Sequence, residues 1–364
     1  MRCFVLWADN QSPHLGGRVL AQGTSEIIRS VLPGATVDYQ DFEVGDSPIA
    51  FNAGAFRSDI GRRHGPIKTR VSRYDLVADT GAGDSFTDAY GWKRRLLMDH
   101  VRRVISAQRI PVLMTPQTIG PFDSLYGRLS ARRGLADARI AMARDPMSVD
   151  CARQLGARAV SATDVVFSLP QVEPALQRDV VLNISGLLWE VDRFAPKEIY
   201  RDLVRRLIRG LLGRGCSVTV LPHVLDNSTL DNDMLAISAI SEEFEGSVEV
   251  IIPADLEDAR RIISGARVVV ASRMHACLNA ISLGVPAYPL AYSRKFGPLL
   301  ADLGWNHGRP VEEANGLPLS QVVEEIIGLR GAAAEAGVSA DLGRERLAAA
   351  VDELRDVLAG ISCS

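Results

Sequence analysis

Short apolar runs alternate with longer amphipathic segments along most of this chain. The first run, residues 3–8, predicts a buried strand, and residues 19–31 predict a helix. Further strands are expected at residues 76–78, 110–115 and 139–143, and a helix at 145–155. This repeated order of strand, loop and helix is typical of a mostly parallel sheet with helices on both faces.

The periodic pattern stops near residues 168–177, where Pro170 and Pro174 lie, and a second series then begins. It predicts strands at 180–184, 218–221, 248–252, 267–271 and 285–290, with helices at 197–212, 232–244, 256–264 and 275–283. Two α/β domains are therefore expected, each a doubly wound, Rossmann-like sheet. We expect them at residues 1–172 and 178–318.

The last segment, residues 319–364, is expected to be helical. Leu347, Val351, Leu354 and Leu358 recur at spacings of four, three and four, which gives one apolar stripe. Such a stripe predicts a helix that packs back across the first domain, and a helix that binds a partner protein is the alternative.

Composition narrows the class of protein. A chain of 364 residues is long enough for roughly two domains, and 47% hydrophobic with 23% charged residues is typical of a globular protein. The net charge of −3 gives no reason to expect nucleic-acid binding. No apolar run approaches the ~20 residues of a membrane-spanning helix, and no secretion signal is evident.

The five cysteines favour a cytoplasmic protein with reduced thiols. They lie at positions 3, 151, 216, 277 and 363, and none forms a CxxC pair. An odd number without close pairs argues against a disulfide framework or a cysteine-built zinc site.

Candidate chemistry follows the strands, because ligands of open α/β sheets bind beyond the carboxyl ends of the strands. After residues 76–78 comes a glycine-rich loop that contains Gly83 and ends at Asp84. Its glycines allow close backbone approach, and amides at a following helix start favour an anion. A plain strand-to-helix turn, with Asp84 as the helix cap, is the alternative.

Two more strands of the first half end in polar residues. A rigid loop at 116–122 carries Gln117, which is expected to point into a cleft or to support the loop. Arg144 follows the strand at 139–143, where a guanidinium is well placed to bind a carboxylate or phosphate. A structural ion pair of Arg144 with Asp145 or Asp164 is the alternative.

The second half carries the sharpest feature of the chain. Ser272, Arg273 and His275 follow the strand at 267–271, so that the histidine falls in the first turn of a helix and can change charge near neutral pH. His223 follows the strand at 218–221. Lys295, one of four lysines, follows the strand at 285–290, where a solvated helix start is the alternative.

These cations and histidines predict a site for a small, highly charged anion with an acid/base group beside it. No metal is expected, because the histidines lack HExxH or HxH spacing. A serine hydrolase is not expected either, because GxSxG is absent.

The motifs together resemble the polysaccharide pyruvyl transferases. They run in order as GAGDSF (81–86), PQTIGPF (116–122), ARD (143–145), DVVF (164–167), SRMHA (272–276), SLGVP (282–286) and AYSRK (291–295). The resemblance covers about residues 1–305, and its RxH followed by SLGVP and YSxK is quite specific.

The resemblance implies a GT-B-like fold, with two Rossmann-like domains around a cleft. It implies transfer of the enolpyruvyl unit of phosphoenolpyruvate to a sugar as a ketal, with release of phosphate and no cofactor. Arg273 and His275 would be active-site residues, and Arg144 and Asp84 would also lie at the site. The first domain would hold the acceptor and part of the donor site, and the second would hold the donor.

The chemistry of that reaction gives each residue an expected role. His275 would be the acid/base group, Arg144 and Arg273 would bind the donor, Lys295 would stabilise charge, and Asp84 would orient or deprotonate the acceptor hydroxyl. The remaining expected substrate-binding residues are His223, Gly83, Gln117, Ser272 and Asn10. A nucleotide-linked or lipid-linked sugar would be the acceptor, and a lipid-linked one would place the enzyme at the inner membrane surface.

One loop departs from the family pattern. Many members have N-x-G-D after the first strand, whereas residues 9–18 keep the glycine but have no aspartate after it. Two other functions therefore stay open: a nucleotide-sugar glycosyltransferase and a non-catalytic carbohydrate-binding relative. The first is disfavoured because residues 274–292 contain no Asp or Glu to hold a ribose. A dehydrogenase is a weak third, because GxGxxG is absent.

Overall fold

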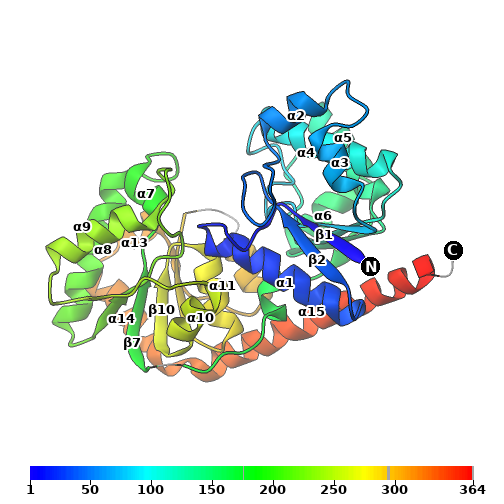
Figure 1. Cartoon of the computed structure of the whole chain (residues 1–364). Coiled ribbons are helices and arrows are strands. Elements are labelled where there is room, and N and C mark those ends of the chain that lie inside the picture. Colours follow the sequence, from blue (N-terminus) through cyan, green and yellow to red (C-terminus); the bar gives the residue numbers. More distant parts are fainter. Residues whose placement is uncertain (175, 293–295, 363–364) are drawn as a thin grey trace. The chain divides into compact units, whose positions relative to one another are not determined.

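Two parallel sheets, each flanked by helices, make up the protein in this computed structural model (Figure 1). The structure describes residues 1–174, 176–292 and 296–362. Contacts divide the chain into two compact units. The first unit contains residues 1–12, 17–169 and the chain from 344 onward, and the second contains residues 13–16 and 170–343.

The sheet of the first unit has six parallel strands in the order β2-β1-β3-β4-β5-β6. Their bounds are β1 (Arg2–Leu6), β2 (Thr36–Gln40), β3 (Leu76–Asp79), β4 (Val112–Gln117), β5 (Ile140–Ala143) and β6 (Val160–Ser161). Strands β1, β3, β4 and β5 confirm the predicted strands within a few residues. The side chains of β1, β3 and β5 are almost all buried, which explains why apolar runs revealed these strands.

The helices of the first unit were only partly predicted. They are α1 (Leu15–Val31), α2 (Ala53–Asp59), α3 (Pro66–Val71), α4 (Trp92–Ala107), α5 (Leu125–Asp137), α6 (Pro146–Gln154) and the short 3-10 helix η1 (Val165–Ser168). Helices α1 and α6 confirm the predicted ones, and Asp145 caps α6 by accepting from the Ser148 N–H at 2.8 Å. Helix α4 buries Met98, Val101 and Ile105 in the core, but arginines between them obscured its period.

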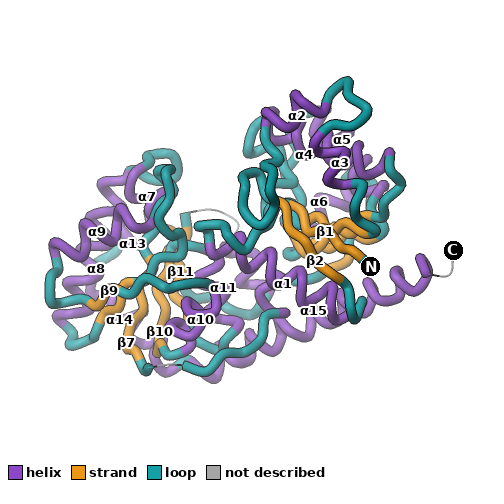
Figure 2. The backbone as a smooth tube through the Cα atoms, in the orientation of Figure 1, coloured by secondary structure: helices purple, strands orange, loops and turns teal. Residues whose placement is uncertain are grey.

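The sheet of the second unit has the order β12-β11-β10-β7-β8-β9, and all its pairs are parallel. Its strands are β7 (Arg178–Asn183), β8 (Val218–Val220), β9 (Glu249–Val250), β10 (Ala266–Ala271), β11 (Ala287–Ala291) and β12 (Arg309–Pro310). The first five confirm the predicted strands. Figure 2 shows these strands in orange with helices beside them.

The helices of the second unit begin with α7 (Gly186–Glu190), α8 (Lys197–Gly213), α9 (Asp233–Glu243), α10 (Leu256–Ser264) and α11 (Met274–Ser282). They continue with α12 (Phe296–Asp302), α13 (Val311–Gly316), α14 (Leu319–Gly328) and the 3-10 helix η2 (Leu329–Gly331). Helices α8 to α11 confirm the predicted ones. In Figure 1, α8, α13 and α14 lie on one side of β7 and β10, and α10 and α11 lie on the other. This is the doubly wound arrangement expected from the sequence.

The last helix, α15 (Ala333–Ser362), lies within residues 319–364, which were expected to be helical. From Arg344 onward it belongs to the first unit, so the chain returns to the unit where it began. Leu347, Leu354 and Leu358 are buried, and Glu353 pairs with Arg158 at 2.8 Å. The helix that packs back is thus confirmed. Among the described residues, no helix is long and apolar enough to cross a membrane.

Candidate functional site

Each sheet has one place where its strand order reverses. In the first sheet β1 lies between β2 and β3, and in the second β7 lies between β8 and β10. In open α/β folds, ligands bind beyond the carboxyl ends of the strands at such a switch point. The glycine-rich loop follows β3, and Arg273 and His275 follow β10. Both predicted clusters therefore lie where this fold class binds ligands.

The glycine-rich loop of the first unit is closed by its own hydrogen bonds. Its backbone turns through positive φ angles at Gly81 (56°), Ala82 (50°) and Gly83 (75°). The Gly81 N–H donates to Asp79 Oδ1 at 2.9 Å, and the Gly83 N–H donates to the Thr80 carbonyl at 2.9 Å. No helix starts at this loop, since α4 begins only at Trp92. The predicted anion cradle at a helix start, and the alternative of Asp84 as a helix cap, are both wrong.

The side chain of Gln117 packs against this loop. Its side chain is completely buried, and Nε2 donates to the carbonyl of Asp79 at 2.8 Å and to that of Thr115 at 3.1 Å. A Cβ built on Gly81 would lie only 2.0 Å from Gln117 Oε1. The amide of Gln117 therefore joins the ends of β3 and β4 where they meet the loop, and does not point into an open cleft.

Arg144 lies buried beneath the loop. Its Nη1 pairs with Asp164 Oδ2 at 3.0 Å, and its Nε donates to Thr118 Oγ1 at 2.9 Å. A Cβ on Gly83 would lie 3.5 Å from Arg144 Nη1. The structure thus contains the Arg144–Asp164 pair that the sequence left as an alternative. Arg144 Nη2 makes no hydrogen bond with a described residue.

Asp84 lies where the loop becomes partly exposed. Its Oδ2 accepts a hydrogen bond from the Tyr90 hydroxyl at 2.7 Å. Arg94 lies nearby with its guanidinium 5.1 Å from the centre of the Tyr90 ring. Burial lowers the pKa of Arg94, while Asp84, Tyr90 and Asp41 favour its charged form. Arg94 is a cation of this group that the sequence did not single out.

Asn10, in the loop after β1, is attached to its own unit. Its backbone N–H donates to Asp46 Oδ2 at 3.0 Å. Asp46 in turn donates its N–H to Asp9 Oδ2 at 2.7 Å. The loop and residues 45–46 therefore hold each other in place.

In the second unit, Arg273 and His275 follow the end of β10, as predicted. Arg273 is the N-terminal cap residue of α11, and His275 falls in the first turn of that helix. Ser272 before them is buried, and its Oγ accepts from the Tyr200 hydroxyl at 2.8 Å. Ser272 thus fixes the strand end by a bond to α8.

Asp233 at the start of α9 organises this group. One carboxylate oxygen accepts from Arg273 Nη2 at 2.6 Å and from the Gly186 N–H at 2.8 Å. The other accepts from the N–H groups of His223 and Val224, each at 2.9 Å. Burial favours the neutral acid, but Arg273 and these N–H groups hold the pKa of Asp233 below its ordinary value. Asp233 therefore stays ionised.

Arg273 is the fully charged partner in this arrangement. It also pairs with Asp231, and its backbone N–H donates to Asn183 Oδ1 at 3.1 Å. Although burial disfavours the cation, Asp233 and Asp231 raise the pKa of Arg273 above its ordinary value. Its Nη1 makes no hydrogen bond with a described residue, which leaves N–H donors for a ligand.

A short segment from the N-terminal part of the chain completes this group. Residues 13–16 belong to the second unit, where His14 forms a β-bridge with Val224 and the Leu15 N–H donates to the His223 carbonyl at 3.0 Å. His14 Nε2 lies 3.9 Å from Asp231 Oδ2. Burial lowers the pKa of His14, although Asp231 opposes this.

Gly16, the last residue of this segment, packs against the side chain of His275. A Cβ on Gly16 would lie 2.7 Å from His275 Nδ1, so that any larger residue would displace the imidazole. The glycine that survives from the family pattern is therefore a packing partner of the predicted acid/base residue.

His223 is almost completely buried beside His275. Burial and the neighbouring His275 lower the pKa of His223 to about 3, so its ring is neutral near pH 7. Its Nε2 lies 3.2 Å from Asn279 Nδ2.

Lys295 lies outside the described residues. Among the residues described, Asp231, Asp233, Asn279 and His14 joined the site without having been predicted. A search for carboxylates able to neutralise Arg273 would have pointed to Asp231 and Asp233. Nothing in the sequence signals that His14 pairs with residues more than 200 positions later.

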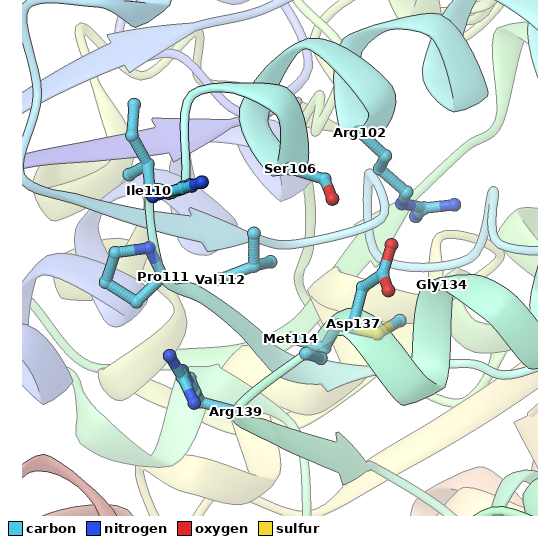
Figure 3. A pocket seen from close by; sticks show the side chains of 11 residues that line it. Arg102, Ser106, Ile110, Pro111, Val112, Met114, Gly134, Asp137 and Arg139 are labelled. Carbon is cyan, nitrogen blue, oxygen red and sulfur yellow. The ribbon is translucent and has the colours of Figure 1, made fainter. Parts of the chain in front are cut away.

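A cavity of about 340 Å³ in the first unit lies away from this chemistry. It is lined by Ser106, Pro111 and Arg139 among others, at the start of β4 and β5 (Figure 3). That is the amino edge of the sheet, opposite to the edge where this fold class binds ligands. No group of three or more His, Cys, Asp or Glu in the described part of the chain could hold a metal ion.

A protein-family model matches most of the chain. The family model described as polysaccharide pyruvyl transferase matches residues 14–294. The chain is also similar to the amylovoran biosynthesis protein AmsJ of Erwinia amylovora, with 20% identity over 257 residues. That alignment covers 65% of this chain and 61% of AmsJ, so the chain spans about three fifths of the length of this relative.

Solved structures show the fold. The UDP-GlcNAc 2-epimerase from Neisseria meningitidis bound to UDP-GlcNAc has a TM-score of 0.58 and 11% identity, covering 99% of this chain and all of that one. Anabaena Alr3699/HepE in complex with UDP-glucose has a TM-score of 0.57 and 12% identity, covering 100% of both chains. The fold is thus GT-B-like, as expected.

Proposed function

Because this chain belongs to the polysaccharide pyruvyl transferase family, we propose that it transfers the enolpyruvyl unit of phosphoenolpyruvate to a sugar of a polysaccharide or glycolipid precursor. The product is a pyruvate ketal, and phosphate is released. The observation that carries this proposal is that Arg273 and His275 both follow β10, at the switch point of the second sheet.

Arg273 has the properties of an anion-binding residue. Its charge is held by Asp231 and Asp233, its guanidinium is fixed in orientation, and its Nη1 has N–H groups left for a ligand. Phosphoenolpyruvate has a carboxylate and a phosphate, either of which can accept two hydrogen bonds from a guanidinium. Arg273 binds the donor substrate in this proposal.

His275 supplies and takes protons. Protonation of the methylene carbon of phosphoenolpyruvate gives an oxocarbenium-like centre at the neighbouring carbon. One sugar hydroxyl attacks that carbon and gives up its proton, which restores the acid. A second hydroxyl then forms the other C–O bond as the bond to phosphate breaks, and its proton leaves with the phosphate. One imidazole can carry the first two proton transfers.

Residues of the first unit take part as separately testable proposals. Asp84, held by Tyr90, orients or deprotonates an acceptor hydroxyl. Arg144 assists in donor binding through Nη2, although Asp164 already neutralises its charge. Lys295 stabilises charge. A nucleotide-linked or lipid-linked acceptor fits the family, and a lipid-linked acceptor would place the reaction at the inner face of the cell membrane.

The test is ligand-induced thermal stabilisation. A ligand at 100 times its Kd adds about 2.7 kcal/mol to stability, which gives a clear rise in Tm. We expect phosphoenolpyruvate to raise the Tm, and UDP, GDP and NAD to leave it unchanged. Arg273→Lys keeps a charge beside Asp233 but loses the planar fork, so the shift should largely disappear. Arg309→Lys, in the same unit but paired with Glu325, is the matched control.

The same measurement separates the second candidate function. The solved neighbours include complexes with UDP-GlcNAc and UDP-glucose, which favours a nucleotide-sugar enzyme as the alternative. Stabilisation by UDP with no response to phosphoenolpyruvate would replace the pyruvyl transferase by that alternative. If phosphoenolpyruvate is the stabilising ligand, phosphate release in the presence of a sugar acceptor would complete the case for pyruvyl transfer.

A further inference from the structure

A chain of three buried side chains ends at His223. Arg260 on α10 donates from Nη1 to Asn279 Oδ1 at 2.7 Å and to Ser282 Oγ at 3.2 Å. Its Nη2 donates to the Pro170 carbonyl at 3.1 Å. Asn279 lies on α11, one turn after His275, and its side chain is completely buried. Asn279 Nδ2 lies 3.2 Å from His223 Nε2.

The partners of Asn279 fix the orientation of its amide. A guanidinium has only donors, so the amide atom that faces Arg260 must be the oxygen. The amide nitrogen lies 2.8 Å from the carbonyl oxygen of His275, which only accepts. Both ends therefore give the same assignment independently, and Nδ2 is the atom that faces His223.

That assignment fixes the proton on His223. Asn279 Nδ2 is a donor, so His223 Nε2 must accept and carries no proton. In the neutral ring the proton is then on Nδ1. No described residue accepts a hydrogen bond from Nδ1, so this donor remains for a ligand.

The surroundings keep the ring neutral. A proton on Nε2 would be placed against the N–H groups of Asn279, with the Arg260 cation behind them. The charged and titratable groups that face His223 are His275, Asp233, Arg273 and His14. Asp233 alone favours the cation, and its charge is already shared with Arg273 and backbone N–H groups.

We propose that His223 serves this site as a permanently neutral hydrogen-bond donor through Nδ1–H, and that Asn279 and Arg260 are positioning residues that fix this tautomer. The identity of the acceptor atom rests on the proposed function: it is an oxygen of the carboxylate or phosphate of the donor substrate. A neutral imidazole can stabilise charge on an oxygen without transferring its proton. The acid/base work is then left to His275.

The tautomer is read directly by two-bond ¹H–¹⁵N correlation spectra of the full chain labelled with ¹⁵N-histidine. His223→Gln identifies the His223 signals by their loss. Between pH 5 and 8 we expect Nδ1 to be protonated, Nε2 to be bare, and neither to titrate. A proton on Nε2, or a ring that titrates near pH 6.5, overturns the proposal. This readout requires no substrate.

Asn279→Asp tests the positioning role. The carboxylate still accepts from Arg260, and its second oxygen now accepts from His223, while the bond from the amide to the His275 carbonyl is lost. We expect the proton to move to Nε2 and the ring to titrate at higher pH. Asn315→Asp is the matched control, because Asn315 also accepts from an arginine, Arg206, outside this group. An unchanged His223 spectrum in Asn279→Asp would show that Asn279 does not set the tautomer.

Two variants of His223 test its role as a hydrogen-bond donor. Asparagine places an amide N–H near the position of Nδ1, whereas glutamine places its amide near Nε2. We expect His223→Asn to bind phosphoenolpyruvate within about 10-fold of the wild type and His223→Gln to lose more, on the order of 10- to 100-fold. Equal affinities would overturn the donor role. Absence of phosphoenolpyruvate binding in the wild type, with the tautomer as expected, would instead overturn the proposed function.

Discussion

In the first unit, the polar groups that follow the strands are bound mainly by one another: the glycine-rich loop by Asp79 and Thr80, and Arg144 by Asp164. In the second unit, Arg273 is neutralised in the same way, but three histidines surround it. The same position in the same kind of sheet thus holds a network of mutually bonded groups in one unit and a cluster of imidazole rings in the other. The carboxyl end of a strand can position polar groups for a ligand. The neighbouring side chains decide whether those groups are already bonded to one another.

The sharpest test of this comparison is His275→Ala. Loss of a positioned acid/base group should lower the rate of phosphate release about 10²- to 10⁴-fold, with phosphoenolpyruvate binding largely kept. His100→Ala in the first unit, which removes a partner of Asp59, is the control and should leave the rate within a few-fold. Full turnover by His275→Ala would remove the acid/base role from the second unit.

Breaking the buried arginine–aspartate pair of either unit should cost more stability than breaking the partly exposed pair of Arg273 with Asp231. Asp233→Ala leaves Arg273 short of a partner and several N–H groups without an acceptor, so it should cost about 3–5 kcal/mol in urea unfolding. Asp164→Ala in the first unit should also cost several kcal/mol, whereas the partly exposed Asp231→Ala should cost about 1 kcal/mol or less. Equal losses for Asp231 and Asp233 would contradict the central position of Asp233.

The pH dependence of stability should carry the signature of His223. Its pKa is about 3 in the folded protein and about 6.5 when unfolded, so the unfolded chain takes up the proton first as the pH falls. The contribution to stability is complete above pH 6.5 and is lost toward pH 3, with a slope of about 1.4 kcal/mol per pH unit. Urea unfolding from pH 7 to 4 should show a shallower decline in His223→Gln than in the wild type. If the free energy of unfolding fell with pH equally in both proteins, the pKa of His223 would not be lowered in the folded state.

The smallest expected effects come from glycine substitutions in the two units. Gly16→Ala should displace the His275 ring and lower turnover about 10- to 100-fold, with little change in Tm. Gly83→Ala should mainly cost stability, about 1–3 kcal/mol, because φ there is 75°. Gly337→Ala meets open space and is the control. A turnover loss in Gly83→Ala as large as in Gly16→Ala would show that the first unit takes part in the chemistry as directly as the second.

Local patterns in the sequence determined the strands, the two-part α/β organisation and the location of Arg273 and His275. Buried parallel strands are continuous apolar runs, and the residues after them must lie at one edge of the sheet, so position along the chain becomes position in space. Helix α4 was not predicted, because arginines interrupt its apolar face. The aliphatic stems of such arginines can pack beside the core.

Only the tertiary structure decided which charges are already paired and which residues meet across long separations. Asp164 neutralises Arg144, Asp233 neutralises Arg273, and Gly16 packs on His275 although 259 positions separate them. The proton on His223 was decided by Arg260 and Asn279, two residues that no motif marks. Hydrogen bonds and ion pairs form between atoms within about 3 Å, and sequence spacing does not fix such distances across different elements of the fold.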